Sequence, residues 1–207
     1  MRSPYPFLPP HAPQPLPGDL VGFSGADLLA DAINLATLGW PRRGLSHVAI
    51  VAHYRDRLCV YESTTRSSLS CLIAGRPVDG TQCHPISMAV CSYPGRVYHY
   101  PLHRPLEPDD ADALELRLRR LCQVGRPYDY LGALASRSTL GGLWHRLKFG
   151  RQDLGHLFCS ELVAAMWAKA GILNTSNASK WNPNALARYA VRHGIADRPV
   201  LWKPREA

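Results

Sequence analysis

The stretch Ser46-His47-Val48-Ala49-Ile50-Val51-Ala52 and the segment 57–63 (RLCVYES) decide the fold of this chain. Both segments are apolar or β-branched, and the polar residues 53–56 separate them. This pattern is typical of two antiparallel strands joined by a short turn. The sequence therefore predicts a β-hairpin with a four-residue turn.

The register of this hairpin carries a chemical consequence. If the four-residue turn closes symmetrically, Ala52 pairs with Arg57, and His47 then pairs directly with Glu62. Directly opposed residues point to the same face with their Cβ atoms about 5 Å apart. We therefore expect a carboxylate beside the imidazole of His47, unless a bulge changes the register.

The clearest helix is predicted over residues 159–170, with Gly171 as its end. We place Cys159 at its first turn, and we expect this turn to meet solvent because Ser160 and Glu161 are polar. A thiolate is the nucleophilic form of cysteine, and both a helix N-terminus and a nearby imidazole favour it. The apolar stripe of the helix consists of Leu162, Val163, Met166, Trp167 and Ala170.

Each of these residues also has an ordinary structural interpretation. Cys159 is of a type that often fills cores, a lone histidine such as His47 is commonly a surface residue, and Glu62 suits an exposed strand face. As a set they predict a Cys-His-Glu triad, with Glu62 orienting the imidazole. His156 competes for the role of base, because it lies three residues before Cys159.

The residues in these motifs, and the order of the motifs along the chain, resemble those of one family. The chain is similar to the permuted NlpC-like cysteine peptidases of the YaeF/YiiX amidase type over residues 18 to about 190. The motifs that carry this resemblance are Gly18-Asp19-Leu20, Leu45-Ser46-His47-Val48-Ala49-Ile50-Val51, Val60-Tyr61-Glu62-Ser63, Pro127-Tyr128-Asp129-Tyr130 and Phe158-Cys159-Ser160-Glu161-Leu162-Val163. His47 precedes Cys159 by more than half of the chain, which is the reverse of the papain order.

The resemblance implies a fold, a reaction and roles for residues. It implies an α+β, circularly permuted papain-like fold, in which an antiparallel sheet packs against the helix that carries the cysteine. It implies amide hydrolysis with Cys159 as nucleophile, His47 as base and Glu62 as orienting acid, and with no cofactor or metal. For the oxyanion hole or the pocket we expect the Cys159 amide, together with Ser160, His156 and Tyr128.

The rest of the chain is read as one domain. Residues 1–17 hold seven prolines and are expected to form an extended arm, and residues 18–207 to form the catalytic domain. We expect further strands at 18–23, 85–90, 96–102 and 199–202 and further helices at 28–38, 107–124 and 128–136. The arm and a loop over residues 138–154 have no counterpart in the family.

Composition limits the class of protein. Hydrophobic content of 46% and charged content of 19% are typical of a globular domain. We interpret the net charge of +8 as a feature that promotes solubility. No signal peptide, membrane span or zinc-ligand spacing is visible, so we expect a cytoplasmic protein with mostly free thiols. Export by a non-classical or phage-associated route is the alternative. The expected partners are peptide or amide substrates, including cell-wall peptides or lipids, and not nucleic acid. The sequence does not indicate an oligomeric state.

Two alternatives remain open at this point. An acyltransferase or phospholipase of the lecithin:retinol acyltransferase-like group has the same permuted fold, although that group typically carries a histidine where Glu62 stands. A catalytically silent module that binds cell wall or protein is the other alternative. An adduct on Cys159 separates the enzymes from the binding module.

Overall fold

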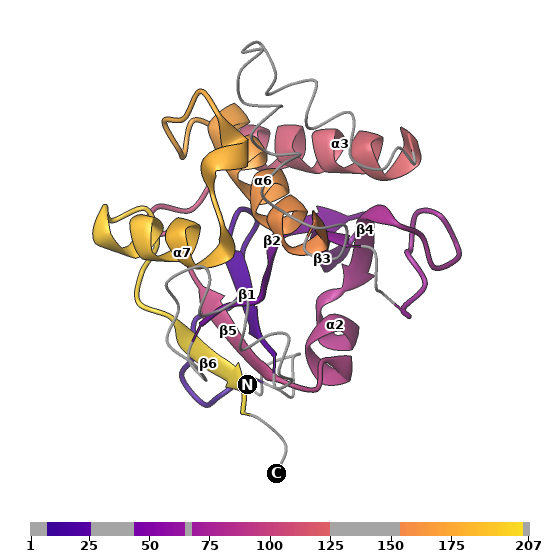
Figure 1. Cartoon of the computed structure of the whole chain (residues 1–207), viewed down its shortest axis with the longest axis horizontal. Coiled ribbons are helices and arrows are strands. Elements are labelled where there is room, and N and C mark those ends of the chain that lie inside the picture. Colours follow the sequence, from indigo (N-terminus) through magenta and orange to yellow (C-terminus); the bar gives the residue numbers. More distant parts are fainter. Residues whose placement is uncertain (1–7, 26–43, 65–67, 125–153, 205–207) are drawn as a thin grey trace.

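The computed structural model describes residues 8–25, 44–64, 68–124 and 154–204 (Figure 1). In these ranges, six strands form one antiparallel sheet in the order β4-β3-β2-β1-β5-β6. The strands are β1 (Leu20–Ser24), β2 (His47–Tyr54), β3 (Arg57–Thr64), β4 (Gly80–Pro85), β5 (Arg96–Tyr100) and β6 (Val200–Lys203). The helices within the same ranges are α2 (Ile86–Ser92), α3 (Pro108–Val124), α6 (Leu154–Lys169), α7 (Pro183–Arg192) and the short 3-10 helix η1 (Ala178–Lys180).

Helices cover both faces of the sheet. Side chains alternate along β2, so that Val48 and Ile50 belong to the core beneath α3, α6 and α7, whereas Ala49 and Val51 belong to the core beneath α2. Figure 1 shows α6 lying across the sheet, and this helix packs against β2 and β3. The expectation of an α+β domain with an antiparallel sheet against the helix of Cys159 is therefore confirmed.

Trp167 attaches α6 to the chain just before β1. Its side chain is fully buried, and its indole N–H donates a 2.8 Å hydrogen bond to the carbonyl of Gly18, just before β1. Burying a tryptophan with its N–H satisfied combines a large apolar contact with one directional bond. This contact sets the position of α6 over the middle of the sheet.

The predicted four-residue turn of the hairpin is wrong. Strand β2 continues to Tyr54, which pairs with Arg57, so that only Arg55 and Asp56 form the turn. Two-residue loops suit the twist of a hairpin but need a positive backbone φ, and Arg55 has φ of 55°. The register is therefore shifted, and Ala52 pairs with Cys59 instead of Arg57.

The predicted strand over residues 85–90 is also wrong. Pro85 is the last residue of β4, and helix α2 begins directly after it. Proline has no N–H to donate to a strand ladder and suits the start of a helix. Ile86, Ala89 and Val90 follow at helical spacing and are buried together against the sheet.

The helix that carries Cys159 begins earlier than the sequence suggested. It starts at Leu154, so that Cys159 lies in the second turn instead of the first. Its predicted end is confirmed, because Gly171 has φ of 71° and the N–H of Ile172 returns to the carbonyl of Trp167.

Other predictions of secondary structure divide into three groups. The strands expected at 18–23, 96–102 and 199–202 and the helix at 107–124 are confirmed as β1, β5, β6 and α3. The helices expected at 28–38 and 128–136, and nearly all of the 138–154 loop, lie outside the described residues. In the part of the chain that the structure describes, no helix has the length and apolar character needed to cross a bilayer.

Candidate active site

The candidate site lies where two neighbouring strands stop pairing. The ladder between β2 and β3 ends at the pair Ile50–Tyr61. Both strands continue beyond it: β2 pairs with β1 as far as its first residue, His47, and β3 pairs with β4 as far as its last residue, Thr64. The sheet is thus divided at this end, and side chains from the two separated strands meet there.

His47 and Glu62 meet at this division. Nε2 of His47 lies 2.5 Å from Oε2 of Glu62, and the two side chains are 14% and 12% exposed. The ring of Phe23 on β1 packs beside the imidazole, with ring centroids 5.5 Å apart. The carboxylate therefore fixes one ring nitrogen, while the aromatic contact limits rotation of the ring.

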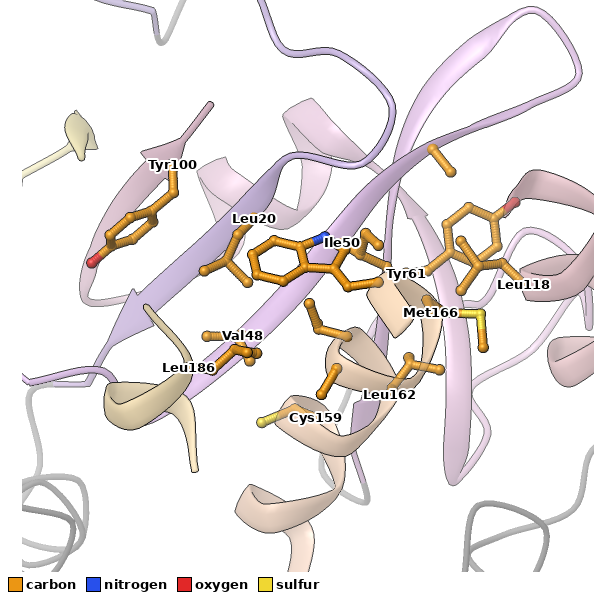
Figure 2. Close-up of a cluster of buried hydrophobic side chains, with 14 of the residues drawn as sticks. Leu20, Val48, Ile50, Tyr61, Tyr100, Leu118, Cys159, Leu162, Met166 and Leu186 are labelled. Atoms are coloured by element: carbon orange, nitrogen blue, oxygen red, sulfur yellow. The ribbon is translucent and has the colours of Figure 1, made fainter. Parts of the chain in front are cut away.

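Cys159 approaches the same imidazole from α6. Its side chain forms a hydrogen bond with His47, and because Glu62 occupies Nε2, we assign the sulfur to Nδ1. The three residues named by the sequence are thus connected in the order Cys159, His47, Glu62. Figure 2 shows Cys159 on α6 near Leu162, within the buried cluster.

Two expectations about Cys159 are wrong. Its side chain has no exposed surface, and Ser160 and Glu161 are also buried, so that this turn does not meet solvent. The cause is the earlier start of α6, which places Cys159 inside the helix on the side that packs against β2 and β3. A backbone N–H in a second turn donates within the helix, and the Cys159 amide is therefore not a ready oxyanion donor.

The electrostatics of the site favour a charged histidine. Burial alone lowers the pKa of His47, but the negative charge and hydrogen bond of Cys159, followed by those of Glu62, raise it to about 10. Burial tends to raise the pKa of Glu62, but the hydrogen bond and charge of His47 and the charge of His84 lower it. The contacts with Cys159 and Glu62 therefore favour the imidazolium form of His47.

Two residues behind Glu62 were missed by the sequence analysis. Gln82 on β4 is the direct cross-strand partner of Glu62, and His84 follows on the same face, with Nε2 3.5 Å from Oε1 of Glu62. Both side chains are fully buried. The sequence analysis missed Gln82 and His84 because it did not recognise residues 80–85 as the strand beside β3.

The hydrogen bonds of Gln82 determine the tautomer of His84. The amide nitrogen of Gln82 donates to the carbonyls of Thr64, at 3.1 Å, and Val78, at 2.5 Å. Its Oε1 is then left to accept from Nε2 of His84, at 3.0 Å. Nε2 of His84 therefore carries a hydrogen, directed at Gln82 with Glu62 next to it, and the buried Nδ1 has no hydrogen-bond partner among the described residues.

Helix α7 fixes the chain just before His47. The side chain of Asn184 accepts from the N–H of Leu45 at 2.8 Å and donates to its carbonyl at 3.0 Å. These two bonds imitate a strand pair, and both of their ends are buried. The entry to β2 is thereby anchored by a residue far away in the sequence.

Of the three residues expected at the oxyanion hole or pocket, the structure describes the side chain of Ser160 and leaves the other two outside the described residues. Ser160 is fully buried, and its hydroxyl donates a 2.6 Å hydrogen bond to the carbonyl of Trp181, so that its role is to tie α6 to the segment before α7. His156 lies on α6, but its side chain is outside the described residues, as is the whole of Tyr128.

A second histidine–carboxylate pair lies elsewhere in the sheet. Nε2 of His99 on β5 is 2.7 Å from Oδ2 of Asp19, and both side chains are buried. The same carboxylate accepts from the backbone N–H groups of Leu16 and Leu102, and the ring of Trp202 stacks on His99. This pair joins the start of β1 to β5, and we interpret it as structural.

Comparison with known proteins gives a likeness to solved structures but no match by sequence. No family profile matches the sequence, and no curated protein matches it. The structure is similar to a crystal structure described as the metalloprotein yiiX from Escherichia coli O157:H7. The two chains are 18% identical, the similarity covers 91% of this chain and 89% of that chain, and the TM-score is 0.49.

Proposed function

We propose that the chain is a cysteine hydrolase of the permuted papain-like type, which cleaves amide bonds through a thioacyl-enzyme. The observation that carries this proposal is the continuous contact from Cys159 through His47 to Glu62. A thiol beside an imidazole that a carboxylate orients is the arrangement that nucleophilic catalysis by cysteine requires.

The acylation step uses the charged state of the pair. The Cys159 thiolate attacks the carbonyl carbon of the substrate, and the new C–S bond gives a tetrahedral oxyanion. The His47 imidazolium then transfers its Nδ1 proton to the amide nitrogen, the C–N bond breaks, and the amine leaves. Glu62 retains its hydrogen bond to Nε2 and thereby keeps Nδ1 directed toward the reacting atoms.

The deacylation step returns the enzyme to its starting state. Neutral His47 removes a proton from water at Nδ1, and the resulting hydroxide attacks the thioester carbonyl. Collapse of this second tetrahedral intermediate breaks the C–S bond and releases a carboxylic acid, while Cys159 becomes a thiolate again beside the imidazolium. No residue other than the triad needs to exchange a proton.

The proposed substrates are peptide or lipid amides, which is the substrate class that the family resemblance implies. Because the sulfur has no exposed surface, the scissile carbonyl has to enter beside the partly exposed His47 and Glu62. Reaction therefore requires side chains around Cys159 to move, and a small acyl donor is the most suitable first probe.

The experiment is acylation by p-nitrophenyl acetate, followed by intact-protein mass spectrometry and peptide mapping. We expect one acetyl group on Cys159, which hydroxylamine removes. Cys159→Ala should lose this adduct and keep the fold, since removing one buried sulfur leaves only a small cavity. The matched control is Cys91→Ala, which removes an exposed thiol and should retain the adduct. Acetylation confined to other residues in the folded wild type would reject the proposal.

A further inference from the structure

Four buried cysteines outside the proposed triad share one hydrophobic core cluster and interact with one another. They are Cys59 on β3, Cys83 on β4, Cys122 at the end of α3, and Cys71 in the loop between β3 and β4. Such a group first suggests a metal site. However, in the ranges that the structure describes, no group of three or more His, Cys, Asp or Glu residues is arranged to hold an ion. The four thiols therefore need another interpretation.

The sulfur of Cys71 is surrounded by hydrogen-bond donors. The thiol of Cys122 donates to it, and so do the backbone N–H groups of Ala74, Cys83 and Ile73, with a distance of 3.4 Å for Cys83. The hydrogen bond from Cys122 and these backbone donors, against the opposing effect of burial, lower the pKa of Cys71 to about 5. The loop thus holds a thiolate in a nest of backbone amides.

Cys122 is the complementary partner of this thiolate. Its hydrogen bond to Cys71 and its burial raise its pKa, so that it remains a protonated thiol. It also lines a cavity of about 420 Å³, together with Ile73 and Ala74 of the nest. Small solutes in this cavity therefore come into contact with Cys122 and with two residues of the nest that holds the Cys71 sulfur.

We propose that Cys71 and Cys122 are a redox-active dithiol, which a hydroperoxide converts into a reversible disulfide. The Cys71 thiolate attacks one oxygen of hydrogen peroxide, forming a sulfenic acid and releasing hydroxide. The thiol of Cys122 then attacks the Cys71 sulfur, the S–O bond breaks, and the hydroxyl group leaves as water with the thiol proton. One thiolate and one thiol thereby lose two electrons, and the peroxide becomes one hydroxide ion and one molecule of water.

The thiols of the other two buried cysteines, Cys59 and Cys83, also form a hydrogen bond with each other, but neither of these residues lines the cavity. Cys59 lies opposite Pro85 and Cys83 lies opposite Tyr61, so that the two cysteines are diagonal neighbours in the sheet. Diagonal neighbours are about 7–8 Å apart, beyond the usual separation for a disulfide. Cys71 lies in a loop, which can adjust by the small movement that a bond requires.

The test is oxidation of the full chain with hydrogen peroxide, alkylation of the remaining thiols after unfolding, and peptide mapping. A Cys91→Ala background removes the exposed thiol and prevents cross-linking between molecules. We expect a peptide pair joined through Cys71 and Cys122, which dithiothreitol separates. The disulfide would close the long loop between Cys71 and Cys122, and this should raise the Tm of the oxidised protein by about 5–10 °C.

Two additional variants make the result specific. Cys122→Ala removes the resolving thiol, and it should leave Cys71 as a sulfenic acid that dimedone labels, with no increase in Tm. Cys59→Ala is the matched control, and it should still form the cross-link. Absence of the Cys71–Cys122 peptide after oxidation overturns the proposal, whether the thiols stay reduced, oxidise singly or join in another pair. Because Cys159 takes no part, neither outcome bears on the proposed hydrolase.

Discussion

His47 and Glu62 make a 2.5 Å contact although their strands do not place them opposite each other. Extended beyond its last pair, the register of β2 and β3 puts Ala49 opposite Glu62. Side chains alternate with a period of two, so a shift of two residues keeps His47 and Glu62 on one face. The separation of the strands at this end then allows the diagonal contact.

The titration of His47 is the most direct check of the site. We expect its pKa to lie near 10 in the wild type, since Cys159 and Glu62 outweigh the effect of burial. Cys159→Ala should lower this pKa, because it removes the larger of the two favourable contributions. NMR of the imidazole nitrogens against pH measures both values. Ordinary titration near 6.5 in the wild type would contradict the assignment.

The roles of His47 and Glu62 can be separated by the rate of acetylation of Cys159. His47→Ala should reduce this rate by about 10³-fold, because the base is lost. Glu62→Gln retains a hydrogen-bond acceptor but loses the charge, and we expect a smaller reduction of about 10–100-fold. Circular dichroism should show both variants folded. Equal rates in the wild type and His47→Ala would transfer the role of base to another residue.

The sequence predicted the contact of His47 with Glu62, but by an incorrect route. The hairpin arithmetic assumed a four-residue turn, and the observed register differs by two positions, which is an even number and so preserves the face. A one-residue bulge would have reversed the outcome. The partners of a strand can thus be inferred more safely by face than by residue.

The setting of Cys159 could not be predicted in the same way. Polar residues such as Ser160 usually mark an exposed turn, but this hydroxyl is satisfied by the carbonyl of Trp181. A contact between residues so distant in the chain has no local signal. The support of Glu62 by His84 was invisible for a similar reason, since it depends on the pairing of β3 with β4.

His84 is predicted to be a positioning residue for Glu62. His84→Ala should slow acetylation of Cys159 by about 10-fold, because one oxygen of the carboxylate loses its neighbour and the side chain gains freedom. It should also raise the pKa of Glu62, since the charge of His84 contributes to the lowering. The fall in the acetylation rate at acidic pH should therefore begin at a higher pH in His84→Ala than in the wild type. If His84 had only a structural role, the variant would be less stable, but the acetylation rate would fall at the same acidic pH as in the wild type.

Asn184 should be important for stability as well as for the site. Asn184→Ala leaves a buried N–H and a buried carbonyl of Leu45 without their partner, at a cost of about 2–4 kcal/mol in the free energy of unfolding. Asn182→Ala is the matched control on the same helix, because it removes only the N-cap bond to Ala185, worth about 1 kcal/mol. Urea unfolding measures both values. Equal losses of unfolding free energy in the two variants would show that the hydrogen bonds of Asn184 to Leu45 stabilise the protein no more than an ordinary N-cap does.

The stability that the His47–Glu62 pair provides should depend on pH in a defined window. The pKa of Glu62 is lowered on folding, so its contribution is present above about 4.5 and is lost as the pH falls below this value. The pKa of His47 is raised from 6.5 to about 10, so its contribution is complete below 6.5 and is lost as the pH rises through 10. The difference in unfolding free energy between the wild type and Glu62→Gln should therefore be greatest at about pH 5–6.5, and should decline on both sides. Urea unfolding of both proteins from pH 3.5 to 10.5 measures this difference, and a constant difference across the range would mean that the two groups are not ionised as a pair.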